Sequence, residues 1–395
     1  MLCNVDRLAA LMEENGLDAI VASSFENVYY FSGTGTRLPF YTGTGAAAII
    51  TRERLNEDTL CMAMPYISLE TEKPTWMGKI EIFGSINILK NDVHVMKWPE
   101  SEIADKLDFY KGKSHDSLVA AVNATLKRLR LSNSKVGFES LEFSNKLDSS
   151  LFAERASAIE IITNARAIKT TDEINILRKS SQINESAFLE SLKFLSEGND
   201  WTDVTLAWYT KWASEGGAGL FWGGGSGSHA SQFYPIESSY KLLDGDVVRY
   251  EGGGTYQEYW ADSGRSAIIG NPKEKELRFA SALAAGANEV RKLLKPGAMP
   301  DDLCNATLQK IREEGIPEFE ISNVWGHGIG LSLNELPRIR PGVNKPLESG
   351  MVICFETPYF ELGWGGLQLE DTYLITDTGY EKFTEMTDKV YKNDN

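Results

Sequence analysis

The chain has 395 residues, of which 42% are hydrophobic and 24% charged, as in an ordinary globular protein. This length exceeds one ordinary core and predicts two domains. The net charge of −16 argues against nucleic-acid and anionic-membrane partners. No segment reaches the roughly 18 apolar residues of a membrane span, and the four cysteines are widely spaced, so we expect a cytoplasmic protein with reduced thiols.

The first part of the chain, residues 1–165, has the pattern of an α/β domain. Apolar residues recur at helical spacing before Gly16, and the apolar run 17–22 is typical of a buried strand. Another helix is predicted at 118–129. The segment 27–45 combines aromatic residues with glycine. Packing of its aromatic side chains in the core is favoured over a loop that contacts a ligand.

A domain boundary is predicted near residues 164–169, so that residues 166–395 form the second domain. Thr170 and Glu173 have the spacing of a capping box, which begins a long helix. An order of two helices followed by strands then occurs twice, with the later helices predicted at about 203–215, 273–294 and 300–314. This recurrence suggests two similar halves, with a site at their joint that takes ligands from both.

Two carboxylates, Glu251 and Asp262, stand in the segment VVRYEGGGTYQEYWADSGR. The β-branched and aromatic residues around them favour strands, and the triple glycine predicts the bend of a hairpin. Such a hairpin would bring the two carboxylates close together. Like charges at close range raise a pKa or require a cation between them.

Three more polar residues interrupt apolar, strand-like runs: His327 in VWGHGIGL, Glu356 in MVICFETPYF and Glu370 in GLQLEDTYLI. Each has a structural explanation by itself, as a satisfied core histidine or as a glutamate paired with an arginine. Burial of an unpaired carboxylate is costly, however, so each acid needs a partner. Together, four carboxylates and one imidazole favour a pair of divalent metal sites.

These motifs resemble those of the pita-bread hydrolases, the M24 family of Xaa-Pro aminopeptidases, prolidases, methionine aminopeptidases and creatinase. The matching phrases are GDVV before Glu251, GHGIGL around His327, LESGMV before Glu356 and LEDTYLIT at Glu370. The resemblance covers nearly the whole chain. It implies an α+β protein in which a smaller α/β creatinase-type N-terminal domain precedes a pita-bread catalytic domain.

The resemblance also implies two divalent metal ions, from Mn, Fe, Co or Zn, bound by Glu251, Asp262, His327, Glu356 and Glu370. Asp262 and Glu370 would bridge both ions, His327 and Glu356 would complete one position, and Glu251 would serve the other. The implied activity is hydrolysis of a C–N bond in a dipeptide or other small substrate, as in Xaa-Pro peptidases. Glu356 would accept and donate the proton.

Three departures from the family pattern, at four positions, keep other functions open. Glu251 replaces the usual aspartate, Asn334 replaces a histidine, and Phe233 with Tyr234 replaces a proline-histidine step. The second interpretation is metal-independent hydrolysis of an amidino or cyclic amidine compound, as in creatinase and ectoine hydrolase. Glu251 would then be base or nucleophile, and His327 a proton shuttle. The third is an inactive peptide-binding module.

The candidate substrate contacts are Asn334, Tyr234, Arg338 and Trp364. The guanidinium of Arg338 suits a substrate carboxylate, although pairing with the surplus acids is an equal alternative. Trp364 would form an apolar wall or pack in the core. The resemblance further implies a homodimer, in which the segment 33–45 of one subunit closes the site of the other.

Overall fold

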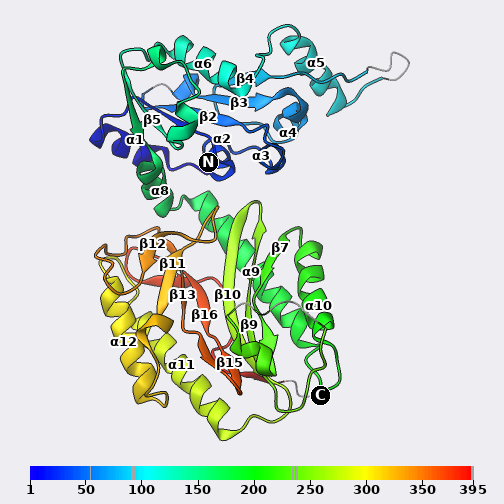
Figure 1. The fold of residues 1–395 in the computed structure, drawn as a ribbon, viewed down its shortest axis with the longest axis vertical. Coiled ribbons are helices and arrows are strands. Elements are labelled where there is room, and N and C mark those ends of the chain that lie inside the picture. Colours follow the sequence, from blue (N-terminus) through cyan, green and yellow to red (C-terminus); the bar gives the residue numbers. More distant parts are fainter. Residues whose placement is uncertain (54, 90–94, 234, 236–238, 393–395) are drawn as a thin grey trace. The chain divides into compact units, whose positions relative to one another are not determined.

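The computed structural model describes residues 1–53, 55–89, 95–233, 235 and 239–392 (Figure 1). The chain divides into two compact units, residues 1–166 and 167–395. Each unit combines helices with a sheet of its own, as expected for an α+β protein.

The first unit is built around a mixed six-stranded sheet in the order β4-β3-β2-β1-β5-β6. β2 pairs antiparallel with β1 and β3, whereas the remaining neighbours run parallel. Parallel neighbours need crossover connections, which helices supply here. The strands are β1 (Ala19–Ala22), β2 (Ala47–Thr51), β3 (Thr59–Ala63), β4 (Lys79–Phe83), β5 (Lys135–Phe138) and β6 (Glu154–Ser157).

The helices of this unit confirm the main sequence predictions. α6 occupies the predicted range, and Ser117 caps it by accepting a hydrogen bond from the backbone N–H of Ala120. The segment 27–45 is largely helical, and its first aromatic residues are buried, which confirms core packing. The helices are α1 (Val5–Glu14), α2 (Phe25–Ser32), α3 (Leu38–Tyr41), α4 (Ile67–Glu72), α5 (Glu100–Tyr110), α6 (Leu118–Leu129), α7 (Leu141–Ser144) and α8 (Ile159–Ala167).

The second unit contains a ten-stranded sheet whose main path is β12-β11-β13-β16-β10-β9-β7. The strands on this path are β7 (Ala218–Trp222), β9 (Val247–Tyr256), β10 (Tyr259–Ile268), β11 (Trp325–Gly328), β12 (Glu335–Ile339), β13 (Val352–Glu356) and β16 (Glu370–Ile375). Three short strands pair beside it: β8 (Gly225–Ser226), β17 (Tyr380–Lys382) and β18 (Tyr391–Lys392). β14 (Tyr359–Glu361) and β15 (Gly365–Leu367) form a separate two-stranded sheet.

Four long helices accompany this sheet, two in each half: α9 (Thr171–Leu192), α10 (Trp201–Ser214), α11 (Glu274–Leu293) and α12 (Pro300–Glu313). α9 begins at the predicted capping box, in which Thr170 and Glu173 exchange hydrogen bonds. Asn184 of α9 donates to the carbonyl oxygen of Gly252 at 2.8 Å and to Ser263 Oγ at 2.7 Å. Since neighbouring strand residues point to opposite faces, Asp262 lies on the face away from α9.

The triple glycine 252–254 does not bend the chain, contrary to the sequence-based expectation. β9 runs straight through it, and the turn of the hairpin is formed by Gln257 and Glu258, both with positive φ. The glycines serve close packing instead. A Cβ atom on Gly254 would lie 2.3 Å from the carbonyl oxygen of Ala218 and 2.9 Å from the Trp212 ring.

This packing predicts that Gly254→Ala destabilises the second unit by about 1–3 kcal/mol, because the added methyl group must displace backbone or an indole ring. Gly379→Ala is the matched control, since its Cβ would meet no described atom within 4 Å and its φ is not positive. Urea unfolding of the two variants measures the difference. Equal stability of the two variants would contradict the packing argument.

All four cysteines are free and buried. Among the described residues, no helix is both long enough and apolar enough to cross a membrane.

Candidate metal centre

The structure brings the five predicted ligands together on adjacent strands of the second sheet. They lie on β9, β10, β11, β13 and β16, which are neighbours in the sheet, and the exposed fraction of each residue is between 1% and 7%. Glu356 and Glu370 are direct cross-strand partners, while Gly264 pairs with both Glu370 and Glu251. The site therefore spans the joint of the two halves, where β10 meets β16.

The centre of this cluster consists of four side chains whose potential ligand atoms all lie within 4.8 Å of one another: Asp262, His327, Cys354 and Glu370. His327 Nε2 lies 3.6 Å from Asp262 Oδ2. On the other side of the ring, His327 Nδ1 lies 3.1 Å from the carbonyl oxygen of Gly328. A carbonyl oxygen can only accept, so Nδ1 carries the proton and Nε2 presents its lone pair to the cluster.

Two carboxylate oxygens in this centre are buried without a hydrogen-bond partner among the described residues, Asp262 Oδ1 and Glu370 Oε1. Buried polar atoms are nearly always paired, so these two oxygens require a ligand. Hard carboxylate oxygens beside one imidazole nitrogen suit a divalent cation. Asp262, His327 and Glu370 therefore fit a metal ion.

The pKa shifts within the cluster also indicate that the acids need a cation. Burial raises the pKa of Asp262, Glu356 and Glu370 well above the ordinary values, and the neighbouring carboxylates raise each pKa further. Burial lowers the pKa of His327, which favours the neutral imidazole that metals bind. Protons or cations must therefore neutralise the acids.

Two residues that the sequence reasoning missed, Arg249 and Gln368, hold the other acids. Arg249 Nη1 lies 2.5 Å from Glu251 Oε2 and 2.7 Å from Gln368 Oε1. Gln368 Nε2 in turn donates to Glu356 Oε2 at 3.0 Å and to Glu370 Oε2 at 3.4 Å. Burial raises the pKa of Glu251, whereas Arg249 opposes that shift. Glu251 and Glu356 thus accept hydrogen bonds from side chains, whereas Asp262 Oδ1 has no partner among the described residues.

Cys354 is the third missed residue, and a common signal could have found all three. Its Sγ lies 3.4 Å from Thr372 Oγ1, and burial raises the pKa of the thiol well above its ordinary value. Each missed residue stands two positions before a predicted ligand: Arg249 before Glu251 on β9, Cys354 before Glu356 on β13, and Gln368 before Glu370, directly ahead of β16. Side chains two apart on a strand share a face.

The candidate substrate contacts are placed differently from one another. Asn334 is exposed, and its Oδ1 accepts a hydrogen bond from Arg338 Nη1 at 3.0 Å. Arg338 is also the cross-strand partner of His327, so this pair borders the centre. Trp364 packs edge-on against Phe279 of α11, which favours its core-packing alternative. Tyr234 lies outside the described residues.

The sequence indicated Phe233 as a departure from the family pattern, but not the aromatic group that it forms with Trp325 and Phe360. The ring centroid of Phe233 lies 6.3 Å from that of Trp325 and 5.7 Å from that of Phe360. Trp325 pairs across strands with Glu356, and the Arg249 guanidinium lies 4.9 Å from the Phe360 ring centroid. This aromatic group gives the acidic cluster an apolar border.

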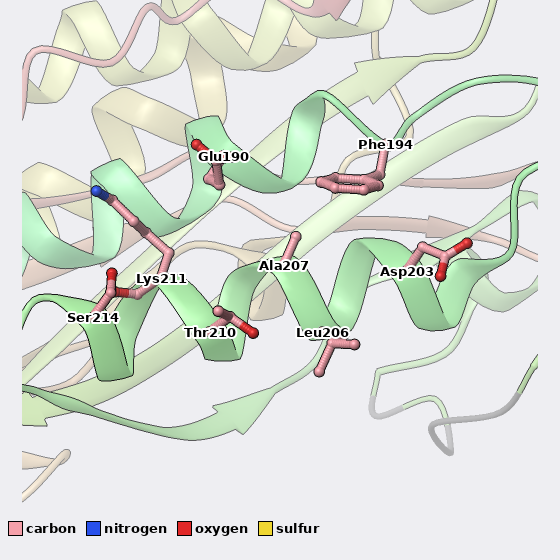
Figure 2. A pocket seen from close by; sticks show the side chains of 8 residues that line it. All are labelled: Glu190, Phe194, Asp203, Leu206, Ala207, Thr210, Lys211 and Ser214. Carbon is pink, nitrogen blue, oxygen red and sulfur yellow. The ribbon is translucent and has the colours of Figure 1, made fainter.

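A hollow of about 390 Å³ lies elsewhere, between α9 and α10 (Figure 2). Side chains such as Phe194 and Leu206 line it, and none of the five predicted ligands contributes. The hollow therefore does not belong to the acidic cluster.

Comparisons with known proteins agree with this geometry. The model of metallopeptidase family M24 matches residues 175–377, and that of the creatinase/prolidase N-terminal domain matches residues 4–178. The chain is 26% identical over 384 residues to an Xaa-Pro dipeptidase of Pyrococcus furiosus, covering 96% of this chain and 97% of that protein. It is 29% identical over 224 residues to a probable dipeptidase, PepE, of Mycobacterium tuberculosis, and the match covers 56% of this chain and 60% of that protein.

Solved structures share the fold of the whole chain. The prolidase from Pyrococcus horikoshii superposes with a TM-score of 0.74 at 24% identity, covering 97% of this chain and 98% of the other. The X-Pro aminopeptidase from Thermotoga maritima gives a TM-score of 0.76 at 21% identity, and the superposition covers 97% of this chain and 100% of the other.

Proposed function

The chain belongs to metallopeptidase family M24 and is a metal-dependent hydrolase of that type, and we propose that it cleaves the amide bond of Xaa-Pro dipeptides or closely related small peptides. One observation carries the metal dependence of this proposal. Asp262 Oδ1 and Glu370 Oε1 are buried without partners beside the imidazole of His327. Mn, Fe, Co and Zn all suit such an oxygen-rich set with one nitrogen.

Four residues of the cluster have defined parts in the proposed reaction. A divalent ion, when bound, would lower the pKa of a water molecule and polarise the carbonyl group of the substrate. Asp262, His327 and Glu370 would hold the ion, and the contact with Gly328 fixes the His327 ring. Glu356 would accept the proton of the water and pass it to the leaving nitrogen. Its hydrogen bond from Gln368 orients the Glu356 carboxylate.

The borders of the cluster suit the two ends of an Xaa-Pro dipeptide. The aromatic group of Phe233, Trp325 and Phe360 offers an apolar surface to the proline ring. The guanidinium of Arg338, oriented by Asn334, offers charge-assisted hydrogen bonds to the C-terminal carboxylate. These contacts support a short substrate with a free carboxyl end.

The metal-independent alternative needs Glu251 as a free base or nucleophile. The pairing of Glu251 with the guanidinium of Arg249 weakens both roles, because one carboxylate oxygen is occupied and the negative charge is stabilised. The same contact therefore favours the metal-dependent reaction over amidine hydrolysis.

Metal removal tests the proposed function. Chelation followed by desalting is expected to lower the hydrolysis of Xaa-Pro dipeptides by at least about 100-fold, and added Mn²⁺, Co²⁺, Zn²⁺ or Fe²⁺ is expected to restore it. Steady-state rates on Xaa-Pro dipeptides and on small amidines, measured before and after chelation, give the result. Amidine turnover that survives complete metal removal would replace this function with the alternative.

We also propose a homodimer and a cytoplasmic location. The family resemblance supports the dimer, with segment 33–45 as the closing element. The four free, buried cysteines support a reducing compartment. A monomeric mass by light scattering at full activity would contradict the dimer.

A further inference from the structure

A buried arginine lies inside the acidic cluster. Arg249 stands on β9 two residues before Glu251, so both side chains project from the same face of the sheet. The exposed fraction of its side chain is 0%. A buried charge must be compensated by partners, and the partners of Arg249 define its role.

All five N–H groups of this guanidinium have acceptors at hand. Nη1 donates to Glu251 Oε2 and to Gln368 Oε1. Nη2 and Nε donate to backbone carbonyl oxygens of the surrounding segments, at distances between 2.6 and 3.4 Å, those of Gly223, Ala230, Gln232 and Phe233. A guanidinium stays charged in proteins, and this one keeps no donor for a substrate. It is therefore a fixed positive charge within the cluster.

This charge divides the cluster into two sides. On one side, Glu251 is bound to Arg249, and Gln368 extends the network to Glu356. On the other side, beside His327, lie the two oxygens without partners, Asp262 Oδ1 and Glu370 Oε1. The need for a cation is thus concentrated on one side.

The family resemblance implies a second ion served by Glu251, but that place adjoins the guanidinium. A divalent ion there would meet a like charge at close range in a buried setting, where repulsion is strong. Four ionised carboxylates carry four negative charges, which the guanidinium and one divalent ion reduce to one. We propose that the guanidinium of Arg249 takes the place of the second metal ion, so that each chain binds a single divalent ion between Asp262, His327 and Glu370.

This inference rests on the proposed metal dependence. The number of metal ions bound per chain distinguishes a failure of this inference from a failure of the proposed function. The metal-free protein is reconstituted with excess Mn²⁺, desalted, and measured by elemental analysis and electron paramagnetic resonance. We expect one Mn²⁺ per chain with the spectrum of an isolated ion. Two ions per chain with a coupled spectrum and Xaa-Pro turnover would overturn the inference alone. Absence of bound metal, with no turnover, would overturn the proposed function as well.

Variants test the role of the guanidinium directly. The double variant Arg249→Met with Glu251→Asp is expected to bind a second Mn²⁺, whereas Arg249→Lys, the charge-matched control, is expected to bind one. A folded double variant that still binds one ion would overturn the inference.

A milder change covers the case in which the double variant fails to fold. Glu251→Gln keeps a carbonyl oxygen for Arg249 and is expected to retain one ion, with Kd changed less than about tenfold. A larger rise of Kd, or loss of an ion, would make Glu251 a ligand and overturn the inference.

Discussion

Asp262→Asn is expected to abolish metal binding and to lower kcat/KM for Xaa-Pro dipeptides by at least about 100-fold. Loss of a partner outside the ligand set alone costs about 10- to 100-fold in such sites, so loss of a ligand costs more. The metal-free variant is expected to unfold at a higher temperature than the metal-free wild type. The amide keeps the shape of the side chain and is neutral without a bound proton or cation, whereas the Asp262 carboxyl group is buried beside Glu251 and Glu370.

Calorimetric Mn²⁺ titration, steady-state kinetics and thermal unfolding in chelator measure these three effects. A metal ligand is expected to lose activity and gain stability on this substitution, whereas a residue that only supports the fold would lose stability. Unchanged Mn²⁺ affinity in Asp262→Asn would remove the metal centre from its predicted place. The matched control is a second buried aspartate, Asp371, which directly follows the proposed ligand Glu370.

Asp371→Asn is expected to destabilise the protein by about 3–5 kcal/mol and to retain Mn²⁺ binding in the folded state. Asp371 points to the face opposite Glu370 and is surrounded by cations. Its carboxylate forms ion pairs with Arg265, with Arg291 Nη2 at 2.9 Å and with Lys382 Nζ at 3.2 Å. Removal of the carboxylate charge leaves the buried guanidinium of Arg265 without its ion-pair partner, whereas the half-buried Arg291 and Lys382 keep Asp388.

The same carboxylate gives a pH dependence of known sign. Burial alone would raise the pKa of Asp371, but the charges of Arg265 and Lys382 outweigh it and hold the pKa below its ordinary value. A depressed folded-state pKa stabilises the fold above the unfolded value of about 3.9, and this stabilisation is lost as pH falls through the folded value. Urea unfolding should therefore show a gap between wild type and Asp371→Asn that narrows below about pH 4. A gap that widens on acidification would contradict this origin.

Elements that are stabilised by interactions between residues close in sequence could be predicted from the sequence. Thr170 and Glu173 form the predicted capping box because both partners lie within one helical turn. The triple glycine shows the limit of such reasoning. Its role depends on indole rings of α10 and on β7, which are distant in sequence. The actual turn at Gln257 and Glu258 contains no glycine to indicate it.

The acidic cluster divides in the same way. Carboxylates such as Glu356 and Glu370 stand out in apolar runs, so the sequence indicates them directly. Arg249 was missed because its role depends on two things that the local sequence does not show. It shares a face of β9 with Glu251, and β9 is aligned with β10, which in turn pairs with β16. The environment of Trp364 depends on the packing of α11, which no local pattern contains.

The joint between β10 and β16 has a mechanical consequence. Their register places Gly264 opposite Glu370, with Asp262 contributed from one half and His327 from the other. An ion held by these side chains would link the two halves of the sheet, and its binding free energy would then contribute to the free energy of folding. Loss of the metal would then lower the stability of the fold as well as stop turnover, so that the supply of metal would also affect how long the folded protein persists.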